Sequence, residues 1–262
     1  MDVSILIGVF FGLEGLFIGS FLNVVIDRLP FGKSLGGRSS CDNCGKRLST
    51  IDLIPVFSYA WQRGKSRCCR KRLKTQYSLV EAATGLAFFV ATTIFISHVK
   101  VLNVHSILAL ISLLIMVATS IAIAVIDFRH HIIPDELQIV LFIGVALYLL
   151  FTESFTVILV GQALIVALPI LLLYLLTHGR GMGFADVKLQ MTLGFWLGLI
   201  PGFLGMYIGF VAGALYGVSL MLLRKASRKS QIAFGPFLLL GAWTIFIWGD
   251  HITLFVKNLF RM

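Results

Sequence analysis

The sequence predicts an all-α protein that crosses a membrane several times. Hydrophobic residues make up 58% of the 262 residues, and the mean hydropathy is +0.95. Charged residues account for only 13%, whereas a soluble domain carries about a quarter. The composition therefore excludes an ordinary soluble domain and favours a polytopic membrane protein.

About eight apolar runs approach the roughly 17–25 residues that a helix needs to span a bilayer. Only Met and Asp precede most of the first run, without a basic n-region, so we expect a permanent span rather than a cleaved signal. The fourth and sixth runs are short, and the boundary between the sixth and seventh rests on Pro201-Gly202. In order, the runs are Ser4–Ile26, Leu79–His98, His105–Ile126, Leu137–Phe151, Phe155–Leu176, Val187–Ile200, Phe203–Leu223 and Ile232–Trp248.

One long polar segment, residues 27–78, separates the first two runs. It holds twelve of the 22 Lys and Arg residues and three acids. Positively charged loops stay in the cytoplasm, so we place this segment inside and the N-terminus outside. The net charge of +10 then reflects topology and contact with anionic lipid headgroups. No interleaving of aromatic and basic residues indicates nucleic-acid binding.

Two aspartates lie at the edges of apolar runs, where ionisable residues are rare in membrane proteins. Asp127 ends the third run and Asp186 precedes the sixth. Counting spans from the basic segment places both at the cytoplasmic membrane surface, and ionisable groups at such positions are functional by default. Gly181 and Gly183 would free the backbone before Asp186, where a substrate strand could approach closely.

Two carboxylates in one site share a proton and titrate as a unit. The ionised member can take a proton from water while the protonated member polarises a peptide carbonyl. This is aspartic proteolysis, which needs no metal or other cofactor. Two alternatives remain open. An aspartate at a helix start can be a cap or dipole partner, which suits Asp135 and partly suits Asp186. A transporter could use the same acids for proton or cation coupling.

Five motifs, in order along nearly the whole chain, resemble those of the type IV prepilin peptidases. These bilobal membrane aspartic peptidases also methylate their product. The motifs are Gly19-Ser-Phe-Leu-Asn-Val-Val-Ile-Asp-Arg-Leu-Pro30, Gln76-Tyr-Ser-Leu-Val-Glu81, Ile126-Asp127 with Ile133-Pro134-Asp135, Gly183-Phe-Ala-Asp186-Val-Lys-Leu189, and Phe234-Gly-Pro-Phe237.

The resemblance implies that Asp127 and Asp186 are the catalytic pair. The family places Gly directly before the second aspartate, where this chain has Ala185. That change would matter only if the position needed a positive φ, and we expect activity to survive it.

The resemblance also implies the reaction and its place in the cell. The substrates are prepilins or pseudopilins of a type IV pilus or type II secretion system, which carry a short basic leader. Cleavage takes place on the cytoplasmic side of the bacterial inner membrane, and S-adenosylmethionine supplies the methyl group. The chain then divides into a first transmembrane helix (1–26), a cytoplasmic cysteine-containing loop (27–78) and a membrane-embedded peptidase domain (79–262). Oligomeric state is not indicated.

All four cysteines lie in the cytoplasmic segment, which indicates a metal site rather than a disulfide in a reducing compartment. Cys41-Asp-Asn-Cys44-Gly has the spacing of half a zinc site. The family's second pair falls on Ser66 and Cys69, which leaves Cys68 as the candidate for the fourth thiolate, although adjacent cysteines chelate one metal awkwardly. We therefore predict zinc at Cys41, Cys44, Cys68 and Cys69, with a metal-free loop as the alternative.

The methyltransferase activity rests on resemblance, because no glycine-rich nucleotide-binding motif occurs in the chain. The same basic loop could instead hold anionic lipid or position the substrate. Glu81 is the one candidate cofactor residue, although a carboxylate at a helix start also compensates the helix dipole. Gly15 and Gly19 form a small-xxx-small pair suited to close packing of the first helix.

Overall fold

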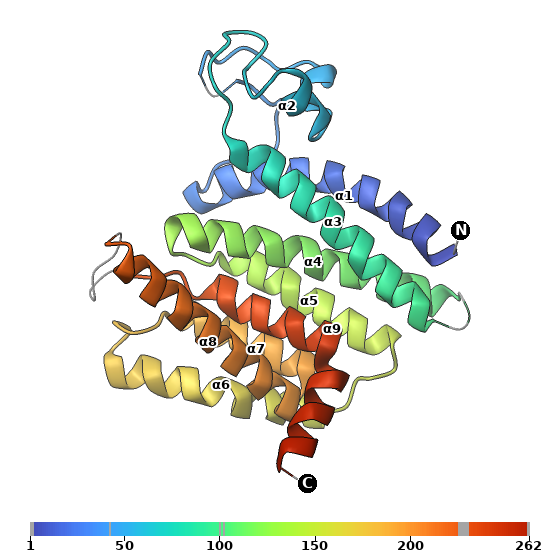
Figure 1. The fold of residues 1–262 in the computed structure, drawn as a ribbon, viewed down its shortest axis with the longest axis vertical. Coiled ribbons are helices and arrows are strands. Elements are labelled where there is room, and N and C mark those ends of the chain that lie inside the picture. Colours follow the sequence, from blue (N-terminus) through green and yellow to red (C-terminus); the bar gives the residue numbers. More distant parts are fainter. Residues whose placement is uncertain (1–2, 42, 100, 102, 225–230, 261–262) are drawn as a thin grey trace. The chain divides into compact units, whose positions relative to one another are not determined.

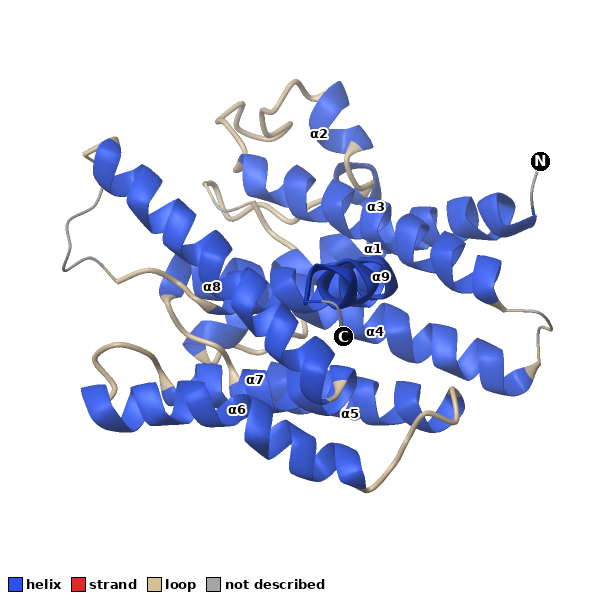
Figure 2. Ribbon diagram, turned by 60° about the horizontal axis from the view of Figure 1, so that its bottom comes forward, coloured by secondary structure: helices blue, strands red, loops and turns tan. Residues whose placement is uncertain are grey.

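A computed structural model describes residues 3–41, 43–99, 101, 103–224 and 231–260 of the chain. Among these residues every regular element is a helix, which confirms the predicted all-α class (Figure 2). The chain forms two compact units, Met1–Ala122 and Ile123–Met262, with the boundary inside the fourth helix.

Each predicted apolar run coincides with a helix of the structure. Five helices are long and apolar enough to cross a membrane, which confirms a multi-pass protein. These are α1 (Val3–Arg28), α3 (Thr75–His98), α4 (Val104–His130), α6 (Ile158–Thr177) and α8 (Leu199–Leu222). The three others are α5 (Asp135–Phe151), α7 (Phe184–Leu197) and α9 (Gly235–Phe260), the last apolar over Gly235–Gly249. The count of eight spans stays a prediction.

The boundary between the sixth and seventh predicted runs was placed wrongly. The helix breaks at Gly198, which has a φ of 78°, and Pro201 lies within the first turn of α8. A proline is tolerated there because the first backbone N–H groups of a helix have no partner inside it. Gly198, which can adopt a positive φ without a Cβ penalty, therefore ends α7.

In the first unit, α1 packs along α3 through small residues (Figure 1). A Cβ at Gly15 would lie 2.9 Å from the Cα of Gly85, and one at Gly19 would lie 2.7 Å from the Cα of Glu81. This confirms the close packing predicted for the glycine pair and fixes Glu81 against α1. The connection between the two helices contains the short elements η1 (Leu29–Phe31), η2 (Thr50–Leu53) and α2 (Phe57–Trp61).

In the second unit, α7 packs against α5, α6, α8 and α9. Eight of its fourteen residues are buried, so this short helix is surrounded by protein. Helices α8 and α9 also pack closely, because α8 presents a row of buried glycines. A Cβ at Gly209 would lie 2.7 Å from the carbonyl oxygen of Phe237. The glycine row thus lets the first turn of α9 approach α8 backbone to backbone.

Candidate functional site

Asp127 lies in the last turn of α4 and is 5% exposed. The helix does not end at this residue, as the sequence suggested, but continues to His130. The backbone N–H of His131 donates to the carbonyl oxygen of Asp127 at 2.8 Å, and His131 then turns the chain with a φ of 54°. Asp127 is therefore a buried residue of the helix itself, within the second unit.

The carboxylate of Asp127 is held by the start of α9. The backbone N–H of Gly235 donates to Asp127 Oδ2 at 2.9 Å in a buried hydrogen bond. Gly235 is the first residue of α9, so its N–H has no partner within its own helix and points toward an acceptor. A Cβ at Gly235 would lie 2.8 Å from Asp127 Oδ2 and 3.0 Å from Ile133 Cδ1, so a larger residue would have to displace the carboxylate.

Asp186 occupies the first turn of α7, with Gly183 as the residue before the helix. The backbone N–H of Gly183 donates to Asp186 Oδ2 at 3.0 Å, so the helix-capping role considered from the sequence is present. The carboxylates of Asp186 and Asp127 also lie close enough to interact electrostatically. Asp186 therefore caps its own helix and also interacts with a second carboxylate.

The residues around Asp186 have ordinary backbone conformations. Gly183 has a φ of −79°, and Ala185 is helical without a positive φ. The substitution of Ala for the family's Gly at position 185 therefore creates no backbone strain. Gly181 has no positive φ either, and its N–H is bound by Thr177 Oγ1 at 3.1 Å.

Asp135 does not cap α5 with its side chain, contrary to the expectation from sequence. It is the first residue of that helix, follows Pro134, and forms an ion pair with Lys188 of α7. This exposed pair ties the start of α5 to the helix that carries Asp186.

The four cysteines come together in the first unit. Their sulfur atoms all lie within 4.8 Å of one another, and all four are free thiols. The Sγ atoms of Cys41 and Cys69 are 3.8 Å apart, and those of Cys44 and Cys68 are 3.1 Å apart. A tetrahedral zinc with Zn–S bonds of about 2.3 Å separates its sulfurs by about 3.8 Å. Small movements of Cys44 and Cys68 would give that geometry, so the donor set fits zinc.

Two copies of one backbone turn carry these cysteines. In the first copy, the N–H of Cys41 donates to the carbonyl of Lys46 at 2.9 Å, and Gly45 bonds back to Cys41. In the second, the N–H of Ser66 donates to Lys71 at 2.8 Å, and Arg70 bonds back to Ser66. Isolated bridges close the two turns at Ser40–Arg47 and Lys65–Arg72.

Because the copies are offset by 25 residues, Ser66 takes the place of Cys41 and Cys69 takes the place of Cys44. The repeated Lys-Arg-Leu at 46–48 and 71–73 was visible in the sequence but was missed.

Ser66 remains at the edge of the cluster. Its Oγ lies 3.4 Å from Cys41 Sγ and 3.0 Å from Cys68 Sγ. The Ser66 hydroxyl and the backbone N–H of Asn43 lower the pKa of the Cys41 thiol to about 6. The hydrogen bond with Cys68 raises the pKa of the Cys44 thiol to about 12. Without a metal, Cys41 therefore loses its proton more readily than Cys44. A bound cation is needed to ionise all four thiols.

Glu81 is buried in α3 and connects that helix to the loop. Its Oε2 accepts a hydrogen bond of 2.7 Å from the backbone N–H of Val56. Val56 has a φ of 61°, which is a strained conformation for a β-branched residue. The role of Glu81 is therefore more than compensation of a helix dipole, because it holds a strained loop residue in place.

Comparisons with known proteins agree with this arrangement. Residues 13–95 match the bacterial peptidase A24 N-terminal domain, and residues 114–218 match the type IV leader peptidase family. A prepilin leader peptidase/N-methyltransferase of Aeromonas salmonicida is 31% identical over 92% of this chain and 90% of its own length. The chain belongs to the type IV leader peptidase family.

Other relatives support the same family. Proteins with the same name from Pectobacterium carotovorum subsp. carotovorum and Pseudomonas aeruginosa are 33% and 30% identical. They match over 88% and 92% of this chain and over 89% and 90% of their own lengths. No solved structure matches the chain. The resemblance found from the motifs is therefore confirmed, whereas the transporter alternative has no support among the relatives.

Proposed function

We propose that this protein is a bifunctional enzyme of the bacterial inner membrane. It cleaves the leader from prepilins or pseudopilins and then methylates the new N-terminal amine with S-adenosylmethionine. One observation supports the first activity above all. Asp127 and Asp186 lie in one unit, close enough to interact, and a glycine N–H orients each carboxylate. The names of the relatives support both activities.

Asp127 and Asp186 are the catalytic pair in this proposal. Each carboxylate gives one oxygen to a backbone N–H, from Gly235 and Gly183 respectively, which leaves its other oxygen for chemistry. One carboxylate takes a proton from the attacking water, while the other donates a proton to the peptide carbonyl. No metal or other cofactor takes part in this reaction.

The proposed topology brings the scissile bond to this pair. With the basic segment 27–78 in the cytoplasm, the N-terminus is outside, and both aspartates lie at the inner membrane surface. The apolar helix of a prepilin lies in the bilayer beside the enzyme, while its leader stays in the cytoplasm. The scissile bond between the leader and the apolar helix then falls at the membrane surface. The basic residues of segment 27–78 contact anionic lipid headgroups.

Zinc at Cys41, Cys44, Cys68 and Cys69 is the proposed metal site, and its role is structural. Four thiolates leave no open position for substrate, which is typical of a zinc that stabilises a fold. The cluster joins two turns that are 25 residues apart, so a bound zinc would tie these two parts of the loop together.

A single reconstitution tests both activities. The full-length protein in liposomes is incubated with a purified prepilin and S-adenosylmethionine, and mass spectrometry determines the N-terminus of the product. We expect a shortened pilin that carries one added methyl group. An uncut prepilin would contradict the peptidase, and a cut but unmethylated pilin would contradict the methyltransferase.

A further inference from the structure

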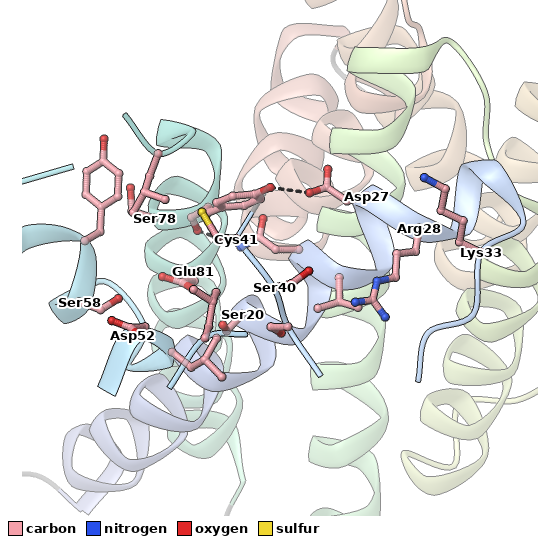
Figure 3. Close-up of a pocket in the computed structure, with 18 residues that line it drawn as sticks. Ser20, Asp27, Arg28, Lys33, Ser40, Cys41, Asp52, Ser58, Ser78 and Glu81 are labelled. Atoms are coloured by element: carbon pink, nitrogen blue, oxygen red, sulfur yellow. Dashed lines mark hydrogen bonds between the residues drawn. The ribbon is translucent and has the colours of Figure 1, made fainter. Parts of the chain in front are cut away.

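A cavity of about 340 Å³ lies within the first unit. Residues of α1, of the loop and of α3 line it, among them Asn23, Cys41, Tyr77 and Glu81 (Figure 3). Its volume falls within the range of small-molecule sites. Because Cys41 forms part of the wall, the cysteine cluster fixes the loop over the ends of α1 and α3.

The lining of the cavity is acidic although the surrounding loop is basic. Three carboxylates line it, those of Asp27, Asp52 and Glu81. Of the twelve basic residues between positions 28 and 74, only Arg28 and Lys33 do so. The Arg28 guanidinium is engaged by the carbonyl of Gly36 at 2.7 Å. In Figure 3 both cations lie on the opposite side of the view from Glu81. Asp27 and Asp52 are paired with Lys74 and Arg67, at 4.0 and 3.8 Å respectively. Glu81 has no ion pair among the described residues, so its carboxylate favours a cationic group of a ligand.

A buried acceptor in the lining of the same cavity lacks a partner. Asn23 is 6% exposed, and its Nδ2 donates to the carbonyl oxygen of Tyr77 at 3.0 Å. That bond leaves the Oδ1 atom without a hydrogen-bond donor in the structure. An unsatisfied buried amide oxygen costs about 1–3 kcal/mol. Asn23 lines the cavity, so a ligand N–H group that reached this oxygen would remove that cost.

We propose that this cavity is the S-adenosylmethionine site, an inference that rests on the proposed methyltransferase function. The donor carries a sulfonium, an ammonium and an adenine amino group, which match Glu81 and the acceptors of the wall, and a carboxylate, which matches Arg28 and Lys33 on the other side of the cavity. It carries no phosphate, so a glycine-rich phosphate loop is not needed. When bound, it supplies a methyl carbon to the pilin amine: the N–C bond forms as the C–S bond breaks, leaving S-adenosylhomocysteine and one released proton.

The chain's own residues have separate tasks in this site. The Glu81 carboxylate accepts hydrogen bonds from the Val56 N–H and the Ser20 hydroxyl, and its negative charge faces the positive charge of the ligand. Asn23 accepts an N–H through its free Oδ1. Asp27 accepts a hydrogen bond from the Tyr77 hydroxyl at 2.8 Å and is paired with Lys74 at 4.0 Å, so it holds the wall of the cavity in place.

Equilibrium binding of radiolabelled S-adenosylmethionine to the full-length protein in nanodiscs tests the site. Glu81→Gln and Asn23→Leu remove a charge and an acceptor with little change of shape. We expect each to weaken binding by about tenfold or more, while prepilin cleavage, measured in the same samples, is retained. Glu153→Gln is the matched control, because Glu153 is an exposed acid in the other unit; its binding should equal that of the wild type.

Crosslinking of the bound ligand by ultraviolet light gives a second readout, which does not depend on the variants. Labelled peptides from residues 20–81 of the wild-type protein would support the site. Labelling confined to residues 123–262, or wild-type affinity in both variants, would overturn it. A wild-type protein that neither binds the donor nor methylates a pilin would instead refute the proposed methyltransferase function.

Discussion

The backbone N–H of Gly235 donates to Asp127 Oδ2 at 2.9 Å, joining two residues that are 108 positions apart. Asp186 has the equivalent bond from Gly183, at 3.0 Å. Both donors stand at the start of a helix, α9 and α7 respectively. Each proposed catalytic carboxylate is therefore oriented by a helix N-terminus, and the contacts that place those helices also place the acids.

Gly235→Ala should impair cleavage, because the new Cβ would lie 2.8 Å from Asp127 Oδ2 and must displace the carboxylate. Misplacement of a catalytic group by about 1 Å can lower a rate by about 100-fold, and we expect a loss of 10- to 100-fold in kcat/KM for a prepilin. Gly161→Ala in α6 is the matched control, since a Cβ there meets nothing within 4 Å. Equal rates for the two variants would show that the Gly235 contact has no functional weight.

Ala185→Gly, which restores the family's residue, should leave cleavage within about twofold of the wild type. Ala185 is helical with an ordinary φ, so glycine offers no relief of strain. Glycine costs a helix about 1 kcal/mol relative to alanine, so a small fall in thermal stability is expected. A rate increase of tenfold or more would mean that Ala185 hinders substrate.

The two repeated turns predict which substitutions remove and restore bound zinc. Cys68→Ser should lower bound zinc from about one per chain to well below one, as measured by elemental analysis. Ser66→Cys in that background should restore binding, because Ser66 occupies the position equivalent to Cys41. Zinc binding that survives in Cys68→Ser alone, or that is absent from the wild type, would contradict the four-thiolate site.

Asp52 should make the order of the loop depend on pH. The Ser49 hydroxyl and backbone N–H lower the pKa of Asp52, with help from Gln62. A carboxyl whose pKa is lower in the folded state stabilises that state above its unfolded pKa of about 3.9. This contribution is lost as the pH falls through the folded pKa. Asp52→Asn should therefore speed hydrogen exchange in residues 49–62 at neutral pH, and the difference from the wild type should shrink as the pH falls below the unfolded pKa. Equal exchange at neutral pH would contradict this.

Much of the peptidase site could be predicted from sequence. Asp127 and Asp186 stood out because charge is rare at membrane edges, and the span count placed them at one surface. The helix ends were less predictable, since a proline in a first turn looks like a breaker although it is tolerated there, as at Pro201.

The contacts between distant segments could not be predicted. The motif at 234–237 was recognised, but nothing local shows that the N–H of Gly235 meets Asp127. The row of glycines on α8 was a visible signal of close packing that was missed. The unpartnered oxygen of Asn23 depends on the approach of α3 to α1, which only three-dimensional packing determines.

Prepilin cleavage by Asp127→Asn and Asp186→Asn, each purified and reconstituted beside the wild type, tests the proposed catalytic pair most directly. Asparagine keeps the shape of the side chain and can still accept the glycine N–H, but it cannot exchange a proton with water. We predict that each variant loses at least 1,000-fold in cleavage rate, in keeping with the loss of a general acid or base, while it still inserts into the membrane and binds S-adenosylmethionine. Cleavage near the wild-type rate by either variant would contradict the catalytic pair.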